Sequence, residues 1–434
     1  MVQDSKTPGG CDRLRVRFDD ERAVANAGIV LPTLLAQRLG LEAIVDARVD
    51  LGERSGAANP GCKVMTLVSA MVLGADCIDG CDVLRSGRTA ALLGHGVAAP
   101  STLGTFLRAF TFGHVRQLDG VIADSLTRAW QAGAGPGDQR LVVDVDSFVW
   151  PVFGRAKQGA AFGYTGKRGY HPIVATRADT GEVLHLRLRK GAANSARGVV
   201  RFADELIARL GRAGASGPKL LRADSAFWNH TLMARLERAG WTYSIGVRNY
   251  NNVKAQAAQI PDDAWITLVN YPDTGEAQIA ETILGDRRMI VRRTRLIGAQ
   301  AELWPDWRHF AFVTNRTEAI EIVEAEHRQH AVVEQAIRDL KDQALAHFPS
   351  GHYAANAAWT VIAALAHNLM RWTALIGLPE QTRRAARTLR RWLLTIPGRL
   401  THSARSWTLH LPARWPWEAD FIRALTRIRA LTAA

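Results

Sequence analysis

Residues 141–149 read LVVDVDSFV, an alternating run rich in β-branched side chains that predicts a β-strand. Because successive side chains of a strand point to opposite faces, Asp144 and Asp146 share one face, roughly 6.6 Å apart along the strand. Val143 and Val145 cover the other face. Two acids on an interior face are costly unless they are paired or bound to a cation, whereas on a solvated face they need no partner. The pattern predicts either a solvated strand face or one part of a cation site.

The segments that follow this strand predict a mixed sheet covered by helices. Two further strands flank the turn ADTG, and the cap-type residues Asn194 and Ser195 open a helix that runs to about residue 212. The strand and helix segments are GYHPIVATR (169–177), EVLHLRLR (182–189), KLLRA (219–223), a helix over 229–240, and YSIGVR (243–248). This order, β-β-β-α-β-α-β, predicts an α/β domain.

A second candidate acid lies in RADSAFW, residues 222–228, where an apolar strand gives way to a turn. Asp224 alone does not indicate a cation site, because Asp and Ser start turns and cap helices in most proteins. Its meaning depends on whether other carboxylates are placed to join it.

A third acid, Glu334, lies on a helix expected from about Thr317 to Leu345. Two imidazoles and two cations fall within about 40° of Glu334 on a helical wheel of 100° per residue: His327, His330, Arg338 and Lys341. An apolar stripe adjoins them, formed by Val333, Ile337 and Leu340. The helix is expected to pack through this stripe and to present the charged face beside it, although a plain surface helix shows the same pattern.

The composition is that of a folded, strongly basic protein. A content of 47% hydrophobic and 22% charged residues is typical of soluble domains, and 434 residues predict about two to four lobes. The net charge of +14 and the pI near 10.2 favour a polyanionic partner, most commonly nucleic acid, although an ordinary basic enzyme can have the same charge.

The cysteines and the apolar segments indicate an intracellular protein. Four cysteines without a CxxC pair predict reduced, structural thiols instead of disulfides or a zinc site: Cys11, Cys62, Cys77 and Cys81. The N-terminus has no apolar core for a signal peptide, and the apolar stretches around 63–74 and 357–370 are too short to span a bilayer. No membrane partner is therefore expected.

The chain divides into five predicted regions. The Gly/Pro-containing stretch QAGAGPGDQ, residues 131–139, marks a boundary after a helical region that could read DNA or serve only for packing. The regions are a flexible N-terminus (1–20), a helical DNA-binding domain (21–135), an α/β core (139–249 and 310–377), a β-rich insertion (250–309) and a basic C-terminal region (378–434).

The C-terminal part carries most of the excess charge. Residues 371–434 hold 12 arginines and no lysine against three acids, which leaves +9, together with five tryptophans. Arginine forks suit phosphates, whereas the tryptophans can pack a small core or stack on bases. An Arg-rich helical tail that binds DNA is expected.

Together, an Asp on the first strand, an Asp after the fourth strand and a Glu on a helix beyond a β insertion form the order of the ribonuclease-H-like nucleases. The sequence resembles the bacterial insertion-sequence transposases of the DDE type, in the IS-thirteen-eighty-like group, over nearly its whole length. The matching stretches are DERAVANAGIVLP, DVDSF, KQGAAFGYTGKRGYHP, TGEVL, RADSAFW, HAVVEQAIRDLK and PSGHYAANAAW.

The resemblance implies which residues form the site. The family's D-x-T element places the first acid on Asp146, with Phe148 where Thr is common, which keeps Asp144 as a second choice; the other acids are Asp224 and Glu334. A Tyr-x₂-Arg-x₃-Glu-x₆-Lys signature falls on His327, His330, Glu334 and Lys341, so both upstream positions differ. The DNA contacts implied are His327, His330, Arg338, Lys341, Lys157 and Arg168.

The resemblance also implies an activity. A DDE transposase binds the terminal inverted repeats of its element, cleaves the ends and joins the freed 3′-hydroxyls to target DNA. Three carboxylates can hold two Mg²⁺ ions, which Mn²⁺ can replace. A homodimer on double-stranded DNA, in the cytoplasm and associated with the nucleoid, is expected. The alternatives are a metal-dependent nuclease without strand transfer and a catalytically inactive DNA-binding protein.

Overall fold

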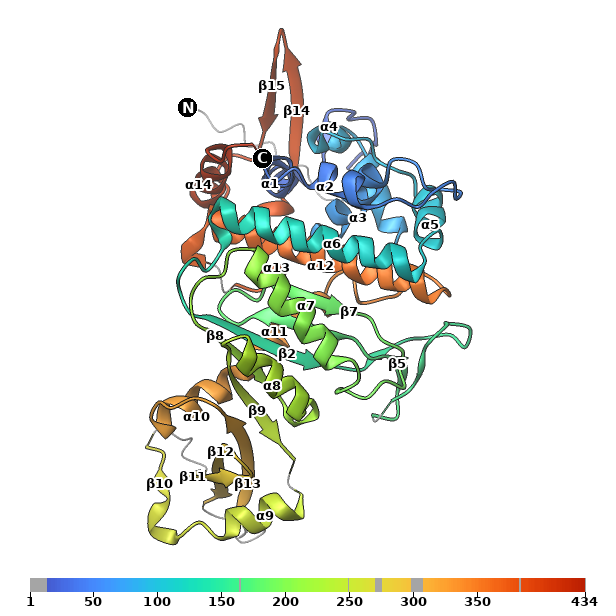
Figure 1. Ribbon diagram of the computed structural model, residues 1–434. Coiled ribbons are helices and arrows are strands. Elements are labelled where there is room, and N and C mark those ends of the chain that lie inside the picture. The colour runs from blue at the N-terminus through green and yellow to red at the C-terminus, as the bar shows by residue number, and fades with distance from the viewer. Residues whose placement is uncertain are drawn as a thin grey trace.

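The computed structural model describes residues 14–163, 165–248, 250–269, 275–297, 307–381 and 384–433. A helical half and a long sheet form an elongated molecule, from which a β-hairpin projects at one end (Figure 1). The strands of the predicted insertion lie at the opposite end.

A nine-stranded mixed sheet forms the centre, in the order β10-β11-β12-β13-β9-β8-β2-β6-β7. The first strand, β2, pairs antiparallel with β6 and parallel with β8, and β8 pairs parallel with β9. The strands are β2 Leu141–Ser147, β6 Ile173–Arg177, β7 Val183–Arg187, β8 Lys219–Ala223, β9 Thr242–Val247, β10 Ile266–Thr267, β11 Gly275–Leu284, β12 Arg287–Leu296 and β13 Arg308–Thr314. The predicted order is confirmed for the strands of this sheet and the helices between them, but three short strands that were not predicted as separate elements lie between β2 and β6, and the helix expected to open at Asn194 and Ser195 begins at Val199.

Helices cover both faces of the parallel part of this sheet. On one face, Val145 and Leu221 lie with side chains of α7 (Val199–Arg212) and α8 (His230–Arg238) around one small cavity. The other face carries α11 (Val333–Lys341) and α12 (Tyr353–Gly377). The predicted stripe of Val333, Ile337 and Leu340 is buried as expected.

The long helix expected over 317–345 is interrupted. It consists of α10 (Ile320–Arg328), a 3-10 turn (Gln329–Val332) and α11. The break frees carbonyl groups from their helical partners, and the guanidinium of Arg222 donates to two of them, those of Glu326 and Gln329. A side chain from a distant strand therefore stabilises the interruption, which periodicity alone could not predict.

The insertion continues the central sheet instead of forming a separate lobe. Strands β10 to β13 extend the sheet from the edge of β9. The β-rich insertion also contains a helix at its start, α9, which spans Asn251–Ala258. A separate three-stranded sheet, β3-β5-β4, lies between β2 and β6 along the chain and is formed by Trp150–Pro151, Arg168–Tyr170 and Ala161–Phe162.

The N-terminal region is helical, as expected, and is completed by α12. This long helix lies beside α6 (Figure 1) and packs also against α1, α3, α5 and α14. The helices are α1 Val30–Arg38, α2 Leu41–Arg48, α3 Pro60–Val72, α4 Thr89–Leu93, α5 Pro100–Arg108 and α6 Phe112–Ala129. No single helix among the described residues is long and apolar enough to cross a bilayer. Taken together, and by length and composition only, the bent pair Ala27–Arg38 and Leu41–Arg48 is long and apolar enough.

The C-terminal region is only partly helical, so the expected helical tail is wrong in its middle. Between α13 (Ala386–Leu389) and α14 (Glu418–Arg429) lie β14 (Gly398–Ser403) and β15 (Ser406–His410). Strand β14 also pairs with β1 (Ala23–Val24). Alternation of Leu400 with polar residues accounts for the strand, because Leu400 packs on the buried Val24 and Ala27.

The tryptophans of this region mainly pack. The rings of Trp392 and Trp417 stack with centroids 5.1 Å apart, and Trp415 donates from Nε1 to the carbonyl of Trp392. Trp372 is fully buried. Trp407, on the projecting hairpin, is 54% exposed and differs from these.

Candidate active site

A buried ion pair lies at the centre of the parallel strands. Asp144 is completely buried and receives two hydrogen bonds from Arg222, from Nε at 2.7 Å and from Nη2 at 2.8 Å. The imidazole Nδ1 of His330 lies 3.0 Å from the same carboxylate. Since Arg222 already neutralises Asp144 within the core, Asp144 is poorly suited to hold a cation.

The pairing register of β2 and β8 places the next acid of each segment, Asp146 and Asp224, beside the other. Asp144 of β2 pairs with Arg222 of β8, and Val145 pairs with Ala223. In parallel strands the same offset brings Asp146 level with Asp224, directly after the last paired residues. Both carboxylates therefore lie at the carboxyl end of adjacent parallel strands, where α/β sheets place their ligand sites.

Two of the predicted acids act electrostatically on the third, Asp146. The pKa of Asp146 is raised to about 6 by burial, against the lowering effects of His330 and of the Ser147 backbone amide. The negative charges of Asp224 and Glu334 raise it further. The acids that sequence reasoning selected, 78 and 110 residues apart, thus converge in space.

The two outer acids face solvent. Asp224 is exposed and accepts a hydrogen bond from the amide of Ala226 at 3.0 Å. Glu334 is exposed in the first turn of α11. Within the described ranges, neither these two nor Asp146 forms an ion pair with a lysine or arginine, so their negative charge is left without a protein counter-ion.

The two histidines of the site have different surroundings. His327 stacks on Phe312 with ring centroids 4.0 Å apart, and its Nδ1 lies 2.6 Å from Ser244 Oγ. Burial, with the nearby charges of His330 and Arg222, lowers the pKa of His327 to about 3, so the ring is neutral. His330 lies close to both Asp144 and Asp146, which suits it to position these carboxylates.

Lys341 approaches the site across two aromatic rings. Its ammonium lies 4.7 Å from the ring centroid of Phe148 and 5.9 Å from that of Trp150. Burial lowers the pKa of Lys341, whereas the charge of Asp146 raises it. Phe148, which replaces the Thr common in the family's first motif, therefore forms a platform that holds the ammonium near Asp146.

An open cleft of about 620 Å³ gives access to these residues. Asp224 and Glu334 lie on its wall, and β9 and β13 form the opposite side. Three guanidinium groups also line it, those of Arg248, Arg292 and Arg328, and the last two bind Glu324 of the same wall, at 3.1 and 2.9 Å. Acids beside a cationic rim suit a phosphodiester substrate, because the cations offset the repulsion between carboxylates and phosphates.

The other predicted DNA contacts differ in how freely they can act. Arg338 is exposed on α11. Lys157 donates to the carbonyls of Phe348 and Ser350 at 2.7 and 3.1 Å. The guanidinium of Arg168 donates to the carbonyls of Gly154 and Arg155. Lys157 and Arg168 therefore hold neighbouring loops in place in this structure, and a DNA contact would require them to exchange these partners.

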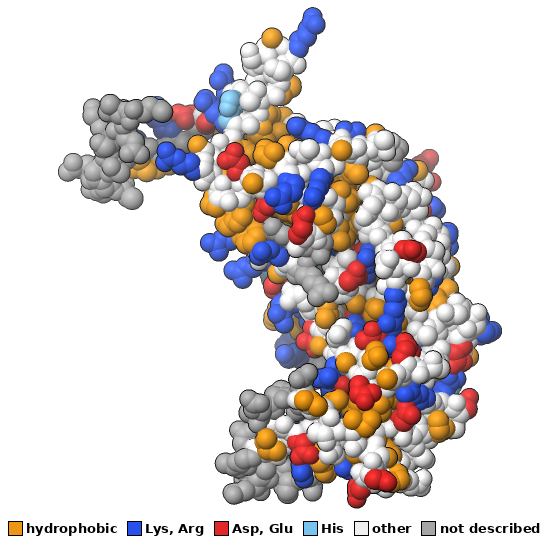
Figure 2. Space-filling model, turned by 90° about the vertical axis from the view of Figure 1, so that its left-hand side faces the viewer, with side chains coloured by type: hydrophobic (Ala, Val, Ile, Leu, Met, Phe, Trp, Pro, Cys, Tyr) orange, Lys and Arg blue, Asp and Glu red, His pale blue; other side chains and the backbone are white. Residues whose placement is uncertain are grey.

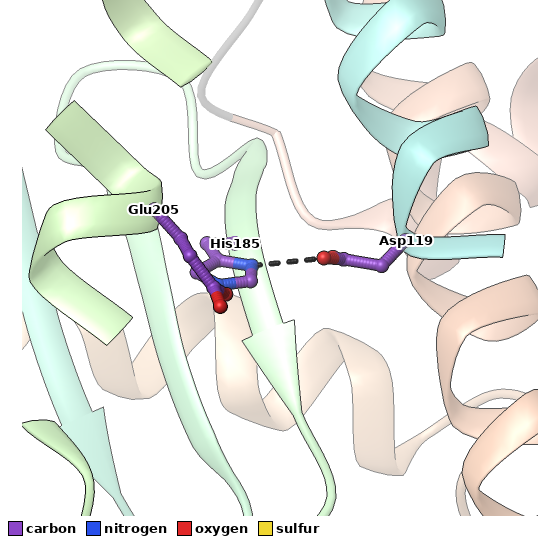
Figure 3. A group of neighbouring side chains, drawn as sticks. All are labelled: Asp119, His185 and Glu205. Atoms are coloured by element: carbon purple, nitrogen blue, oxygen red, sulfur yellow. Dashed lines mark hydrogen bonds and ion pairs between the residues drawn. The ribbon is translucent and has the colours of Figure 1, made fainter. Parts of the chain in front are cut away.

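A second group of acids and imidazole lies outside the cleft. Asp119 of α6, His185 of β7 and Glu205 of α7 converge in the interior (Figure 3). The imidazole lies 3.3 Å from Asp119 and 3.0 Å from Glu205. Four arginines surround them within ion-pair distance, namely Arg116, Arg187, Arg201 and Arg209.

These arginines make the group an ion-pair network instead of a metal centre. Burial alone would raise the pKa of Glu205, but the bonds and charges of His185, Arg187 and Arg116 lower it to about 2. The pKa of Asp119 is also lowered, by His185 and Arg209 against the effect of burial. The network joins the helical half to the sheet, whereas among the described residues no lysine or arginine forms an ion pair with Asp146, Asp224 or Glu334.

Sequence reasoning missed the residue that positions the site, Arg222. It stands two positions before Asp224, as Asp144 stands two before Asp146, and this common offset was the available signal. The three arginines of the cleft were also missed, because they come from segments far apart in the chain.

The chain is similar to known proteins over most of its length. The family model described as "Transposase DDE domain group 1" matches residues 6–433. Among solved structures, a piggyBac transposase synaptic complex with hairpin DNA is similar with a TM-score of 0.46 and 11% identity, covering 86% of this chain and 80% of that one. A search of curated proteins gave no significant match. By the family match over nearly its whole length, the chain belongs to the DDE transposases.

Proposed function

We propose that this transposase binds the terminal inverted repeats of its element, cleaves the element ends and joins the 3′-hydroxyls to target DNA. The observation that carries the proposal is the convergence of Asp146, Asp224 and Glu334 beside an open, arginine-lined cleft. The strand order β7-β6-β2-β8-β9, antiparallel on one side of β2 and parallel on the other, supports a ribonuclease-H-like core.

The three carboxylates fit hard divalent cations. Their oxygens are the ligands that Mg²⁺ prefers. The pKa of Asp146 is raised first by burial and then by the negative charges of Asp224 and Glu334, and a bound cation would relieve this repulsion. Asp146, Asp224 and Glu334 would hold Mg²⁺, and Mn²⁺ in its place. Two such ions, when bound, activate the attacking oxygen and stabilise the leaving oxygen of an in-line displacement.

The protein's own groups position this chemistry. The Arg222–Asp144 pair fixes the two parallel strands, so that Asp146 and Asp224 stay level. His330 and Lys341 lie near Asp146 and offset part of its charge before DNA binds. Arg248 would contact phosphates along the cleft, and Arg292 and Arg328 could join it by exchanging their bonds to Glu324. Because water or a 3′-hydroxyl attacks directly, no covalent protein–DNA intermediate is required.

The proposed oligomeric state and location also follow from the DNA substrate. Two element ends must be held together during transposition, so a homodimer on double-stranded DNA is proposed. Association with the nucleoid in the cytoplasm follows from the DNA substrate and the net charge of +14.

The decisive experiment replaces Asp224 by Asn, which keeps the turn but removes the charge. The variant should fold and bind duplex DNA carrying the sequences that flank the gene, yet cleave at least 10³-fold more slowly; Glu334→Gln should behave alike. Asp263→Asn, on an exposed 3-10 turn, is the matched control and should cleave normally. Substantial cleavage by Asp224→Asn would overturn the assignment.

Joined products separate transposition from simple cleavage. Wild-type protein, Mg²⁺ and a labelled element end should give strand-transfer products in a target plasmid. Cleavage without any joined product would favour the alternative of a metal-dependent nuclease, and binding without cleavage would favour an inactive DNA-binding protein.

A further inference from the structure

The hairpin of β14 and β15 projects from the helical half of the molecule (Figure 1). Its two strands are paired from Arg399 with His410 to Ser403 with Ser406, and Ala404 and Arg405 form the turn. Strand β1 pairs only with Gly398 and Arg399, so the outer part is a two-stranded ribbon. Every residue from 402 to 408 is exposed.

The base of the ribbon is fixed to the body. Leu400 is buried with Val24 and Ala27, and Leu409 packs against the same small core. The amide of Leu400 also donates to the carbonyl of Arg22 at 2.9 Å. The projection is therefore a folded element with a defined direction.

One face of the ribbon is entirely polar. Because cross-strand pairs alternate between faces, this face consists of three pairs: Arg399 with His410, Thr401 with Thr408, and Ser403 with Ser406. The opposite face carries His402 and Trp407 near the tip, with ring centroids 4.5 Å apart. Hydroxyl, imidazole and guanidinium groups can all hydrogen-bond to base edges or phosphates.

The charge of the ribbon is uniformly positive. Residues 397–417 contain no acid. Figure 2 shows a basic side chain at the outermost end of the projection. By the strand pairing, Arg405 lies in the turn of the hairpin. Within the described part of the chain, the one ion pair to the hairpin is a long contact of 3.8 Å between Arg399 and Asp20.

Other arginines of the C-terminal region already have protein partners. Arg371 binds the buried Asp339, and Arg390 donates to the carbonyl of Val72. Arg384 stacks over Trp392, and Arg427 pairs with Glu380. The ribbon places Arg405 at the tip of a projecting element, whereas other exposed arginines of this region lie outside the hairpin, namely Arg387, Arg391, Arg414 and Arg429.

We propose that the β14–β15 ribbon enters the major groove of duplex DNA and contacts the DNA away from the cleavage point. This inference rests on the proposed function. The major groove, about 12 Å wide, admits a two-stranded β-ribbon. The ribbon lies at the opposite end of the molecule from β10–β13, next to which the cleft opens (Figure 1). It therefore contacts base pairs distant from the scissile bond.

A second copy of the chain fits the ribbon less well. A symmetric dimer contact places the same surface on both partners, and an acid-free ribbon would then bring like charges together. Duplex DNA supplies the complementary negative charge along its whole length.

The test compares Arg405→Ala and Thr408→Val with Arg212→Ala, which removes an exposed charge from α7. The probes are a 40-bp duplex of the sequence flanking the gene and a scrambled duplex, in fluorescence anisotropy from 50 to 200 mM salt. Arg405→Ala should reduce the slope of log Kd against log salt by about 0.9 for the lost phosphate contact. Thr408→Val should lower the preference for the flanking sequence about fivefold or more.

Each outcome decides the matter. Slopes and preferences equal to those of Arg212→Ala would overturn the ribbon's role. Unchanged DNA binding, with a dimer-to-monomer shift in sedimentation for the ribbon variants, would also overturn it and identify a second copy as the partner. If the ribbon variants change the salt slope and the sequence preference as expected, but the wild-type protein never cleaves DNA, this inference stands and the proposed catalytic function fails.

Discussion

Asp144 and Arg222 form a buried, doubly hydrogen-bonded ion pair across adjacent parallel strands, two residues before the acids proposed for catalysis. The pair fixes the register of β2 and β8 and supplies a cap for the broken helix between α10 and α11. A charge pair that takes no part in the chemistry thus determines where the carboxylates meet.

Removing one member of this pair should be strongly destabilising. Arg222→Met leaves Asp144 buried without its counter-ion and should lower the free energy of unfolding by about 3–5 kcal/mol in urea denaturation. The double variant Asp144→Leu with Arg222→Met should lose less than Arg222→Met alone, because no unpaired charge remains. The exposed pair is the control: Arg85→Met should cost less than about 1 kcal/mol. Equal losses in the single and double variants would contradict the argument.

Asp146→Asn should stabilise the metal-free protein while abolishing cleavage. The pKa of Asp146 is about 6 in the folded protein, above its ordinary value, so stability falls as pH rises through that pKa and the cost persists above it. At pH 8 without metal, the variant should gain on the order of 1–3 kcal/mol. Thermal melts in EDTA measure this gain, and Asp263→Asn should show none.

The network of Asp119, His185 and Glu205 should make the protein acid-sensitive. The pKa of Glu205 is lowered to about 2, so its contribution is complete above about pH 4.5 and is lost as pH falls toward 2. Glu205→Gln should be less stable than wild type at pH 7 by on the order of 2 kcal/mol, and the two should converge near pH 2. Because arginines neutralise this group, Mn²⁺ should not bind to it. A rise in melting temperature that Mn²⁺ causes in the wild type should therefore persist in Glu205→Gln, and loss of this rise in the variant would indicate a metal centre at Asp119, His185 and Glu205.

Deleting residues 378–434 should damage the fold, which makes truncation a poor test of DNA binding by the C-terminal region. Helix α14 buries Phe421, Ala424 and Ile428 against the body. A Cβ at Gly377 would lie 2.8 Å from that of Ala424. Gly377→Ala should therefore destabilise by about 1–3 kcal/mol through overpacking. Gly211→Ala, in open space on α7, should be neutral or stabilising by up to about 1 kcal/mol.

Trp307 should serve stability instead of base stacking. The guanidinium groups of Arg293 and Arg295 each lie 4.6 Å from its ring centroid. Trp307→Ala should lower the melting temperature without changing the cleavage rate, whereas a large drop in the rate at unchanged stability would favour stacking on DNA. The neighbouring Trp304, another candidate for stacking on a base, lies outside the described residues.

The sequence predicted the parts of the fold that depend on local patterns. The alternation around Asp144, the strand before Asp224 and the apolar length of α12 all predicted their elements correctly. The convergence of three acids was predicted from the order of the elements, and their electrostatic coupling agrees with it.

The parts that sequence reasoning missed depend on distant partners. The 3-10 turn between α10 and α11 is stabilised by Arg222, about 100 residues earlier in the chain. The β14–β15 hairpin needs Val24 and Ala27 beneath Leu400, and the many arginines around it concealed its alternation. The way the β-rich insertion joins the central sheet was not predicted, because no local pattern shows that β13 pairs with β9.

The position of α12 in the sequence also determines when the N-terminal helices can be covered during translation. Helices α1 to α6 emerge first, yet the helix that covers them begins about 280 residues after α3 ends. At roughly 5–20 residues per second, the ribosome needs about 15–55 s to reach it. During that interval the apolar faces of the first helices stay open to chaperones and to neighbouring nascent chains. Each newly made molecule therefore becomes competent only near the end of its own translation.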